Sequence, residues 1–298
     1  MDFRFTQDQQ DLIDAARTFF DGESTPERMR KMVAGEQVSN LWPQFAQLGL
    51  LGIMAPESAG GLEQPLVVMA GIAEAAGYAG VTEPYVEIAG ITVPHAKESE
   101  LSGPIQRAMR SELRPYIDAS LSETGRAVSS IDPLRNLVKA KNGNDENAES
   151  ANVHGAVLTA AQLIGLSQRM VDMSVDYAKD RHQFGKPIGS FQAVKHQLAN
   201  VYTQIEFTRP IIHLAAIKGG AAVHNAKVAA IDTAMLAAVT AIQVHGGMGY
   251  TYEVDLHLFM KRAWALCGEW GDRNYHMKKL EDYVLNGDAQ LGPGQTFN

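Results

Sequence analysis

The segment AKDRHQFGKPIGSFQAVKHQLANVYT, residues 178–203, constrains the fold of this 298-residue chain more than any other. Its glycines and its proline interrupt a helical pattern and require the backbone to turn between two long segments with apolar residues at helical spacing. We therefore expect one helix to close at Arg181 and the next to begin near Phe191. Long helices joined by a short connection pack side by side, which predicts a helical bundle.

Helical periodicity continues through most of the chain. The C-terminal part predicts four long helices, at about 155–180, 189–218, 222–245 and 254–285, the last with a break near Gly268 to Gly271. Near the N-terminus, the segment from Thr6 to Phe20 is amphipathic with Thr6 as its cap, and residues 65–79 form a second apolar helix. The predicted fold class is mainly α, with a C-terminal four-helix bundle.

Composition narrows the class of protein. The single cysteine, Cys267, excludes an internal disulfide and fits a reducing compartment, so we expect a cytoplasmic protein. A net charge of -8 argues against a nucleic-acid partner. We find no apolar run that approaches the length of a membrane span and no signal-peptide pattern, so no membrane partner is expected. No group of His, Cys, Asp and Glu residues has the spacing of a metal site.

A second motif, AIQVHGGMGYTYEVDLHLFMKRA, occupies residues 241–263. Here a helix runs into Gly246 and Gly247 and stops. Glycines past a helix end provide the left-handed cap, and adjacent glycines also let a ligand approach backbone N–H groups closely. Together with Arg181 and Gln243 they could hold a pyrophosphate; a plain turn at the helix end is the alternative.

The two motifs together resemble the C-terminal domain of the acyl-CoA dehydrogenase family of flavoproteins. The family pattern is an Arg, a polar residue and Phe-Gly, then Phe-Gln-Ala, and later Gln-x-x-Gly-Gly-x-Gly. This chain matches it in order with Arg181, Gln183, Phe184, Gly185, Phe191, Gln192, Ala193, Gln243, Gly246, Gly247 and Gly249. Residues 1–20 and 41–62 are similar to the family's opening helix and to its Pro-Glu-x-x-Gly-Gly turn.

The resemblance implies FAD at a subunit interface, because in that family these motifs grip the adenosine diphosphate half of an FAD bound mainly by the neighbouring subunit. Arg181 would pair with the pyrophosphate, a role that suits a planar, permanently charged guanidinium. Phe184 and Ile188 would pack on the apolar edges of the cofactor, with ordinary core packing as the alternative. The cofactor-binding candidates are thus Arg181, Gln183, Phe184, Ile188, Gln192, Gln243, Gly246 and Gly247.

The family's middle β-domain is largely missing from this chain. Residues 129–140 resemble its last segment, and residues 142–150 lack apolar periodicity and predict a solvated linker. The fold that the resemblance implies is acyl-CoA dehydrogenase-like with a strongly truncated middle β-domain. Its expected parts are an N-terminal helical domain (1–112), a β-domain remnant with linker (113–150) and a C-terminal four-helix bundle domain (151–298).

α,β-Dehydrogenation of an acyl-CoA also needs a carboxylate base. Counting forward from the glycine motif places Trp270 at the position of the family's catalytic Glu, and counting back from the Arg motif places Gly155 at the alternative position. We therefore expect no catalytic residue in this chain, with Glu269 and Asp272 as the candidates if the loop shifts in register. A solvated acid near a helix end is the alternative for both, and Asp272 in particular could cap the following helix.

The resemblance therefore implies a subunit of a FAD-dependent acyl-CoA dehydrogenase. Its partner would be a longer acyl-CoA dehydrogenase subunit in an α2β2 hetero-oligomer, which supplies the catalytic Glu. It is similar to shortened subunits that act on bulky steroid side chains, such as that of cholesterol, and electron-transfer flavoprotein is the expected kind of electron acceptor. The alternatives are a self-sufficient homo-oligomeric dehydrogenase that uses Glu269 or Asp272, and a structural subunit that binds no flavin.

Overall fold

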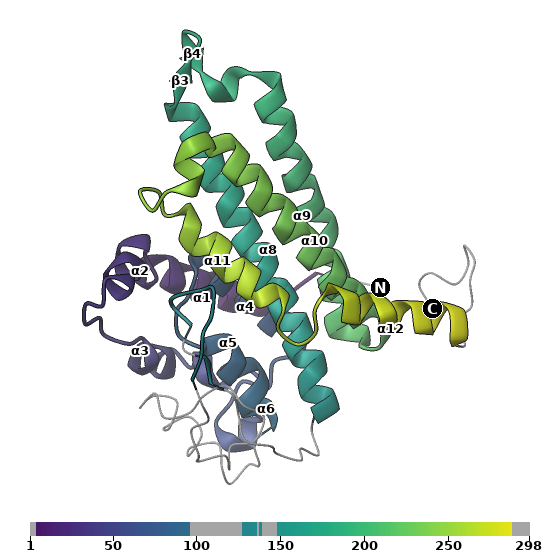
Figure 1. Ribbon diagram of the computed structural model, residues 1–298. Helices are drawn as coiled ribbons and strands as arrows, with labels where there is room; N and C mark the ends of the chain where they lie inside the picture. Colours follow the sequence, from purple (N-terminus) through teal and green to yellow (C-terminus); the bar gives the residue numbers. More distant parts are fainter. Residues whose placement is uncertain (1–3, 96–126, 136, 139–147, 288–298) are drawn as a thin grey trace.

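The computed structural model describes residues 4–95, 127–135, 137–138 and 148–287. An N-terminal group of helices packs against a longer C-terminal group, and both contribute to one hydrophobic core (Figure 1). The N-terminal elements are α1 (Gln7–Glu23), α2 (Pro26–Val33), α3 (Trp42–Gln47), η1 (Leu50–Gly52), η2 (Glu57–Ala59), α4 (Leu66–Ala79), α5 (Tyr85–Glu87), the π-helical turn η3 (Ile88–Thr92) and α6 (Val93–His95). The C-terminal helices are α8 (Ala148–Asp180), α9 (Gln192–Lys218), α10 (Ala221–His245), α11 (Leu256–Cys267) and α12 (Arg273–Asn286).

The N-terminal helices form as their sequence predicts. The Thr6 hydroxyl accepts the Gln9 N–H at 3.3 Å, and the Gln9 side chain accepts the Thr6 N–H at 3.1 Å, so Thr6 caps α1 in a reciprocal pair. The predicted apolar stripe of α1 is buried at Ile13, Ala16 and Phe20. The apolar helix expected at residues 65–79 is α4, most of whose side chains are buried.

Helices α8 to α11 form the predicted four-helix bundle, in which α8 packs against each of the other three. Its boundaries differ from the predictions at two points. α8 begins at Ala148, so the last residues of the expected linker are helical, while residues 142–147 lie outside the described residues. α9 begins at Gln192 rather than at 189, because η5 (Ile188–Ser190) is a 3₁₀ turn. The domain boundaries near residues 112 and 150 stay predictions.

Helix α10 corrects one expectation from the sequence. Together with the following turn it forms the helical stretch Ala221–Tyr250, which is long and apolar enough to cross a membrane. However, 61% of its apolar window is buried inside the protein, as in the core helix of a bundle. The apolar residues of α10 therefore serve to pack against α8 and α9.

Glycines bring α4 into close contact with α8. A Cβ on Gly77 would lie 2.3 Å from the Gln162 carbonyl oxygen, and a Cβ on Gly165 would lie 2.0 Å from the Glu74 carbonyl oxygen. Side chains at these two positions would hold the helices apart. The N-terminal helices and the bundle are thus fixed to each other along this contact.

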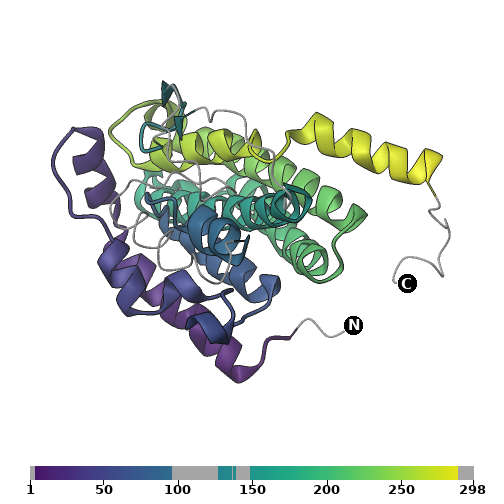
Figure 2. The same cartoon turned by 90° about the horizontal axis from the view of Figure 1, so that it is seen from below.

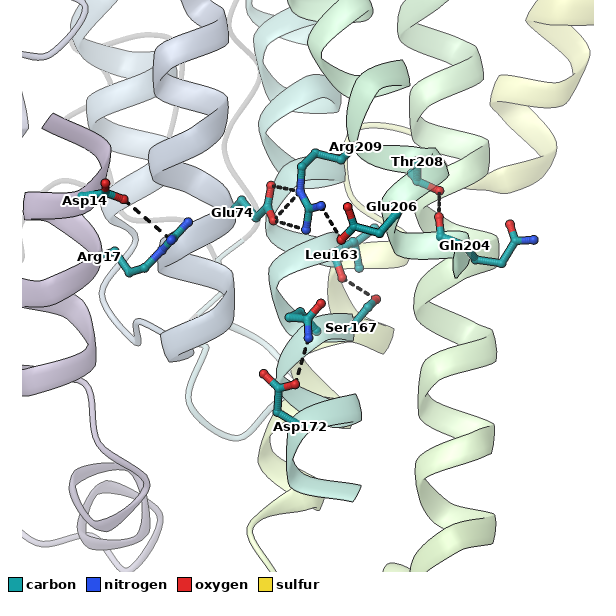
Figure 3. A network of polar contacts seen from close by, with 11 residues as sticks. Asp14, Arg17, Glu74, Leu163, Ser167, Asp172, Gln204, Glu206, Thr208 and Arg209 are labelled. Carbon is teal, nitrogen blue, oxygen red and sulfur yellow. Dashed lines mark hydrogen bonds and ion pairs between the residues drawn. The ribbon is translucent and has the colours of Figure 1, made fainter. Parts of the chain in front are cut away.

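A polar network ties α9 to α4 on one side of this contact (Figure 3). Arg209 Nε donates to Glu74 Oε1 at 3.0 Å, and Arg209 Nη1 donates to Glu206 Oε1 at 2.6 Å. The network borders a cleft of about 650 Å³ between α1, α4, α8 and α9. Because Arg209 pairs with both carboxylates, we assign the network a structural role.

A short middle segment joins the two helical groups. Strands β1 (Ala127–Val128) and β2 (Leu137–Val138) pair antiparallel, with Ala127 opposite Val138. Between them, Asp132 forms a buried ion pair with Arg262 of α11. The described part of this segment is thus a small hairpin that contacts α11. The assignment of residues 113–150 as a β-domain remnant stays a prediction, because its other residues lie outside the described ones.

In the view turned by 90°, α12 extends away from the bundle toward the described end of the chain (Figure 2). It remains attached through α10, with which it packs. The loop between α11 and α12 is thereby held between two packed helices.

Candidate functional site

A β-hairpin at the tip of the bundle carries the Arg motif (Figure 1). α8 ends at Asp180, and β3 (His182–Gln183) pairs with β4 (Lys186–Pro187), as the predicted turn requires. The Ile188 N–H donates to the Arg181 carbonyl oxygen at 2.8 Å and closes the base of the hairpin. In this arrangement the predicted Arg181 and Gln183 side chains are both exposed.

Phe184 and Gly185 form the two-residue loop of this hairpin, with φ values of 55° and 78°. Positive φ at both loop residues is typical of a type I′ turn, which favours Asn-Gly over an aromatic residue. The Phe184 side chain is nevertheless 90% exposed, and its ring meets Phe191 edge-on at 6.1 Å. An exposed aromatic ring on left-handed backbone gains little inside this chain, which favours a contact with a second molecule.

The glycine motif lies at the same end of the bundle. His245, at the end of α10, stacks on Tyr177 of α8 with 4.4 Å between ring centroids. A small apolar cluster of Ala178, Leu198 and Val244 joins the ends of α8, α9 and α10, and Ile188 packs against it. The side chain of Ile188 is half-buried in this cluster. Ile188 therefore contributes in part to core packing, which was the alternative to cofactor contact.

At the glycine motif, one backbone N–H group is already hydrogen-bonded within the fold. α10 ends because Gly246 has a φ of 59°, and η6 (Gly246–Tyr250) follows as a 3₁₀ turn. The Gly246 N–H donates to the carbonyl oxygens of Ile242 and Gln243, so it is not available to a ligand as the sequence suggested. A Cβ on Gly246 or Gly247 would meet no atom within 4 Å, so both glycines leave open space for an approaching group.

The two motifs together present the donors that an adenosine diphosphate group needs. Arg181 offers a guanidinium for pyrophosphate oxygens, and three exposed amide side chains offer hydrogen bonds to polar atoms. These amides are Gln183, Gln192 and Gln243. Phe184 offers an apolar ring face. The residues fit this half of FAD, but they lie on an open surface, so a second surface would have to complete the site.

An apolar groove of about 830 Å³ runs beside the hairpin between α8 and α9. Its lining includes Val175, Pro187, Val194 and Leu198, with Lys179 and Lys195 among its charged residues. Pro187 of β4 is part of the lining, so the groove adjoins the hairpin that carries Arg181 and Phe184.

The two acids that remained as base candidates have structural partners. Glu269 Oε1 lies 3.0 Å from Arg135 Nη1. Burial raises the pKa of Glu269, and Arg135 opposes the rise. Asp272 caps α12, where its carboxylate accepts the Tyr275 N–H at 2.8 Å, as the alternative interpretation predicted.

The two positions at which the family pattern places a base meet in space. Trp270 lies against Gly155, where a Cβ would be 2.1 Å from Cδ2 of the indole. The neighbouring His154 Nδ1 lies 3.1 Å from the Gly90 carbonyl oxygen of η3. An apolar ring and a glycine thus occupy the place that a carboxylate would need.

Sequence reasoning missed three buried polar residues around this loop. Lys227 is fully buried on α10 and donates to the Leu266 carbonyl oxygen at 3.1 Å, and burial lowers its pKa to about 8. His276 is the buried residue of α12, and the Arg135 side chain is buried as well. Lys227 is the one charged residue between Ala226 and Ile231, and this break in an apolar stretch could have identified it from the sequence. Within the described residues, no group of three metal-ligating side chains comes together.

Two family models match this chain. Residues 6–94 match the acyl-CoA dehydrogenase N-terminal domain, and residues 146–280 match the acyl-CoA dehydrogenase C-terminal domain. The acyl-CoA dehydrogenase IpdE2 of Mycolicibacterium smegmatis is 29% identical over an alignment of length 315, gaps included, which covers 94% of this chain and 100% of that relative.

Solved structures share the fold over almost the whole chain. A chain of the ChsE4-ChsE5 complex from Mycobacterium tuberculosis superimposes with a TM-score of 0.82 at 21% identity, covering 97% of this chain and 100% of that one. A variant of the Tcur3481-Tcur3483 steroid ACAD gives a TM-score of 0.78 at 21% identity, covering 95% and 99%. These matches confirm the predicted fold class.

Proposed function

Because this chain belongs to the acyl-CoA dehydrogenase family of oxidoreductases, whose cofactor is FAD, we propose that it is the shortened subunit of a heteromeric acyl-CoA dehydrogenase. In this proposal it grips the adenosine diphosphate half of an FAD whose flavin lies in a longer partner subunit. The observation that carries the proposal is the exposure of Arg181, Gln183, Phe184 and Gln192 together at one end of the bundle.

The exposed hairpin supports an interface rather than a self-contained cofactor pocket. Arg181 and Phe184 lie on its surface, and the described part of the chain places no second wall over them. The adjoining apolar groove between α8 and α9 offers surface that a partner subunit would cover. An exposed ring on left-handed backbone does not stabilise the isolated chain. It therefore favours cofactor contact over a structural subunit that binds no flavin.

The base is proposed to come from the partner. Glu269 is held by Arg135, and Asp272 is held at the N-terminus of α12. Trp270 and Gly155 occupy the two positions where the family pattern has its carboxylate. These contacts disfavour a self-sufficient homo-oligomer.

These contacts suggest which roles the cofactor and the residues of this chain would have in the reaction. FAD, when bound, would be the hydride acceptor of the reaction. The residues of this chain would bind and orient it: Arg181 by charge-assisted hydrogen bonds to the pyrophosphate, and Phe184 by contact with an apolar edge. Gln243, at the end of α10, would hydrogen-bond the adenosine end.

The proposed substrate is a bulky acyl-CoA thioester, with a steroid side chain as the first choice. One of the two solved structures compared above is named a steroid ACAD, which suggests the substrate class. The other is the ChsE4-ChsE5 complex, which is named for two different proteins and so suggests a heteromer. By sequence, residues 113–150 are too few to rebuild the family's full middle β-domain, and the loss of that domain on this side would open room for a polycyclic group. We further propose a cytoplasmic α2β2 complex that passes its electrons to an acceptor such as electron-transfer flavoprotein.

Co-purification tests this proposal. The chain is expressed with an affinity tag in its native host, and the eluate is analysed by mass spectrometry and flavin absorbance. We expect a longer acyl-CoA dehydrogenase chain in equal amount, together with FAD. Elution of this chain alone, or with partners outside the family, would contradict the heteromer.

A further inference from the structure

The loop between α11 and α12 places an indole against the backbone of α8. A Cβ on Gly155 would lie 2.1 Å from Cδ2 and 2.5 Å from Cε2 of Trp270, which no real side chain tolerates. Gly155 lies inside the long helix α8, where alanine is the more favourable residue. The indole therefore accounts for the glycine, because only a residue without a Cβ lets the ring lie against this turn of the helix.

Trp270 is held in this place against its own backbone preference. Its φ is 55°, in the left-handed region that aromatic residues rarely adopt, and Gly271 follows with a φ of 98°. Strain of this kind persists only where surrounding contacts fix the residue. The indole must therefore be held by the groups that flank it in the loop.

Four contacts anchor the loop on both sides of the indole. Before it, Lys227 Nζ donates to the Leu266 carbonyl oxygen and Arg135 pairs with Glu269. After it, the Asp272 carboxylate caps α12. On Trp270 itself, the carbonyl oxygen accepts a hydrogen bond from His276 Nε2 at 3.0 Å. The strained position is thus fixed by both flanks of the loop.

The direction of that last bond also fixes the state of a histidine pair. A carbonyl oxygen only accepts, so His276 carries a proton on Nε2, and its Nδ1 lies 2.8 Å from His224 Nδ1. Burial lowers the pKa of both rings, so a neutral His276 accepts at Nδ1 from His224. Both rings are neutral in this arrangement. His224 on α10 therefore holds His276, and His276 holds the carbonyl of Trp270.

We propose that Trp270 is a fixed plug, whose indole fills a surface-connected chamber between α8 and the α11–α12 loop. Trp270 packs on the main core yet is itself partly exposed, so the space that it fills reaches from Gly155 to the surface. The assignment of this space as an acyl chamber rests on the proposed function, because it is the two base positions that meet there. The plug closes this chain's own chamber to substrate.

A double-variant cycle tests the contact on the full chain. Gly155→Ala alone should lower the melting temperature by several degrees, because the new methyl group drives the indole from its place. In the Trp270→Gly background the same substitution should raise the melting temperature, because alanine then favours the helix. Glycine also suits the positive φ at position 270, so this background keeps the loop geometry. Equal effects of Gly155→Ala in both backgrounds would overturn the contact.

Chemical rescue tests the chamber. Indole at millimolar concentration should raise the melting temperature of Trp270→Gly, and butyryl-CoA should raise it more than free CoA does. The matched control is Trp264→Ala, which removes another partly buried indole that packs on the same core. No rescue of Trp270→Gly, or equal rescue of the control, would overturn the surface-connected chamber. Equal shifts with butyryl-CoA and CoA would overturn its assignment to an acyl group.

The flavin absorbance of the wild-type complex with its partner tests the proposed function separately. A complex that contains FAD but whose Trp270→Gly variant shows no rescue overturns the plug alone. A complex without FAD overturns the proposed function, whatever indole does.

Discussion

Arg135 and Glu269 form an ion pair of 3.0 Å between Nη1 and Oε1 that joins the middle segment to the α11–α12 loop. Arg135 also lies 3.0 Å from Glu87 of α5, so one guanidinium serves two carboxylates from different parts of the chain. Burial raises the pKa of Glu269, with the opposing effect of Arg135 and a further rise from Glu87. This arrangement makes Glu269 a structural acid that connects the helical groups.

Glu269→Gln should therefore reduce stability and leave turnover nearly unchanged. Loss of a charged partner for buried Arg135 is expected to destabilise the chain by roughly 1–3 kcal/mol. Removal of a general base would instead lower activity by about 10²–10⁴-fold. Steady-state rates of the reconstituted complex and the melting temperature of the chain separate the two. Glu253→Gln, an exposed acid in the preceding loop, is the control and should change neither.

Arg181→Ala should lower FAD retention in the complex by roughly ten- to a hundredfold, since a charge-assisted hydrogen bond contributes about 1.5–3 kcal/mol. Arg181→Lys should recover only part of it, because the forked guanidinium geometry is lost. Flavin absorbance after gel filtration measures the retained cofactor. Lys218→Ala removes an exposed positive charge at the other end of α9, away from the hairpin, and it should retain FAD like the wild type. Full retention in both Arg181 variants would leave Arg181 as an ordinary helix end.

Phe184→Asn should improve the stability of the isolated chain and weaken the complex. Asn tolerates the φ of 55° and forms with Gly185 the favoured type I′ pair, so the free energy of unfolding should rise by about 0.5–1 kcal/mol. FAD retention should fall, because the exposed ring is the proposed apolar contact. Phe207→Asn, at another exposed phenylalanine on α9, should leave retention unchanged. A variant that is more stable and retains FAD fully would show that Phe184 has no cofactor contact.

His276 makes stability depend on pH. Burial lowers its pKa to about 4, below the ordinary value of about 6.5. Between these values the unfolded chain binds a proton that the folded chain does not, so the contribution of His276 is full above pH 6.5 and is lost as the pH falls toward 4. Allowing for solvent screening, we expect a loss on the order of 2 kcal/mol.

The measurement is the melting temperature of the wild type minus that of His276→Gln, taken from about pH 7.5 to about pH 4.5, a range that spans the ordinary pKa of histidine. This difference should decrease steadily toward the acid end. For His196→Gln, at an exposed histidine of α9, the same difference should stay flat. A difference for His276→Gln that grows as the pH falls would mean that the ring is protonated in the folded chain.

The sequence predicted those features of the fold that depend on local pattern. The apolar stripes of α1, α4 and the bundle helices, the Thr6 cap and the turn after Arg181 are all confirmed, because helical periodicity, capping and glycine-proline interruptions act over a few residues. The resemblance of the two motifs to a family was confirmed for the same reason, since each motif is a short contiguous string.

The contacts that define the base region depend on residues distant in sequence, and no local pattern reports them. Gly155 meets Trp270, and Arg135 meets Glu269, across more than a hundred residues of chain. Counting from the motifs identified the two family base positions but not that they touch. The expectation about membrane-spanning length was wrong for the stretch Ala221–Tyr250, because composition alone does not tell a buried bundle helix from a membrane span.

We propose that this chain holds FAD only together with a partner that supplies the flavin pocket and the base. The most direct test is the flavin absorbance spectrum and acyl-CoA oxidation rate of the purified chain, measured alone and after reconstitution with its longer partner. We expect a nearly colourless, inactive chain, and a yellow, active complex whose activity disappears when the partner's catalytic Glu is replaced by Gln. A yellow chain with one FAD per polypeptide and turnover on its own would contradict it.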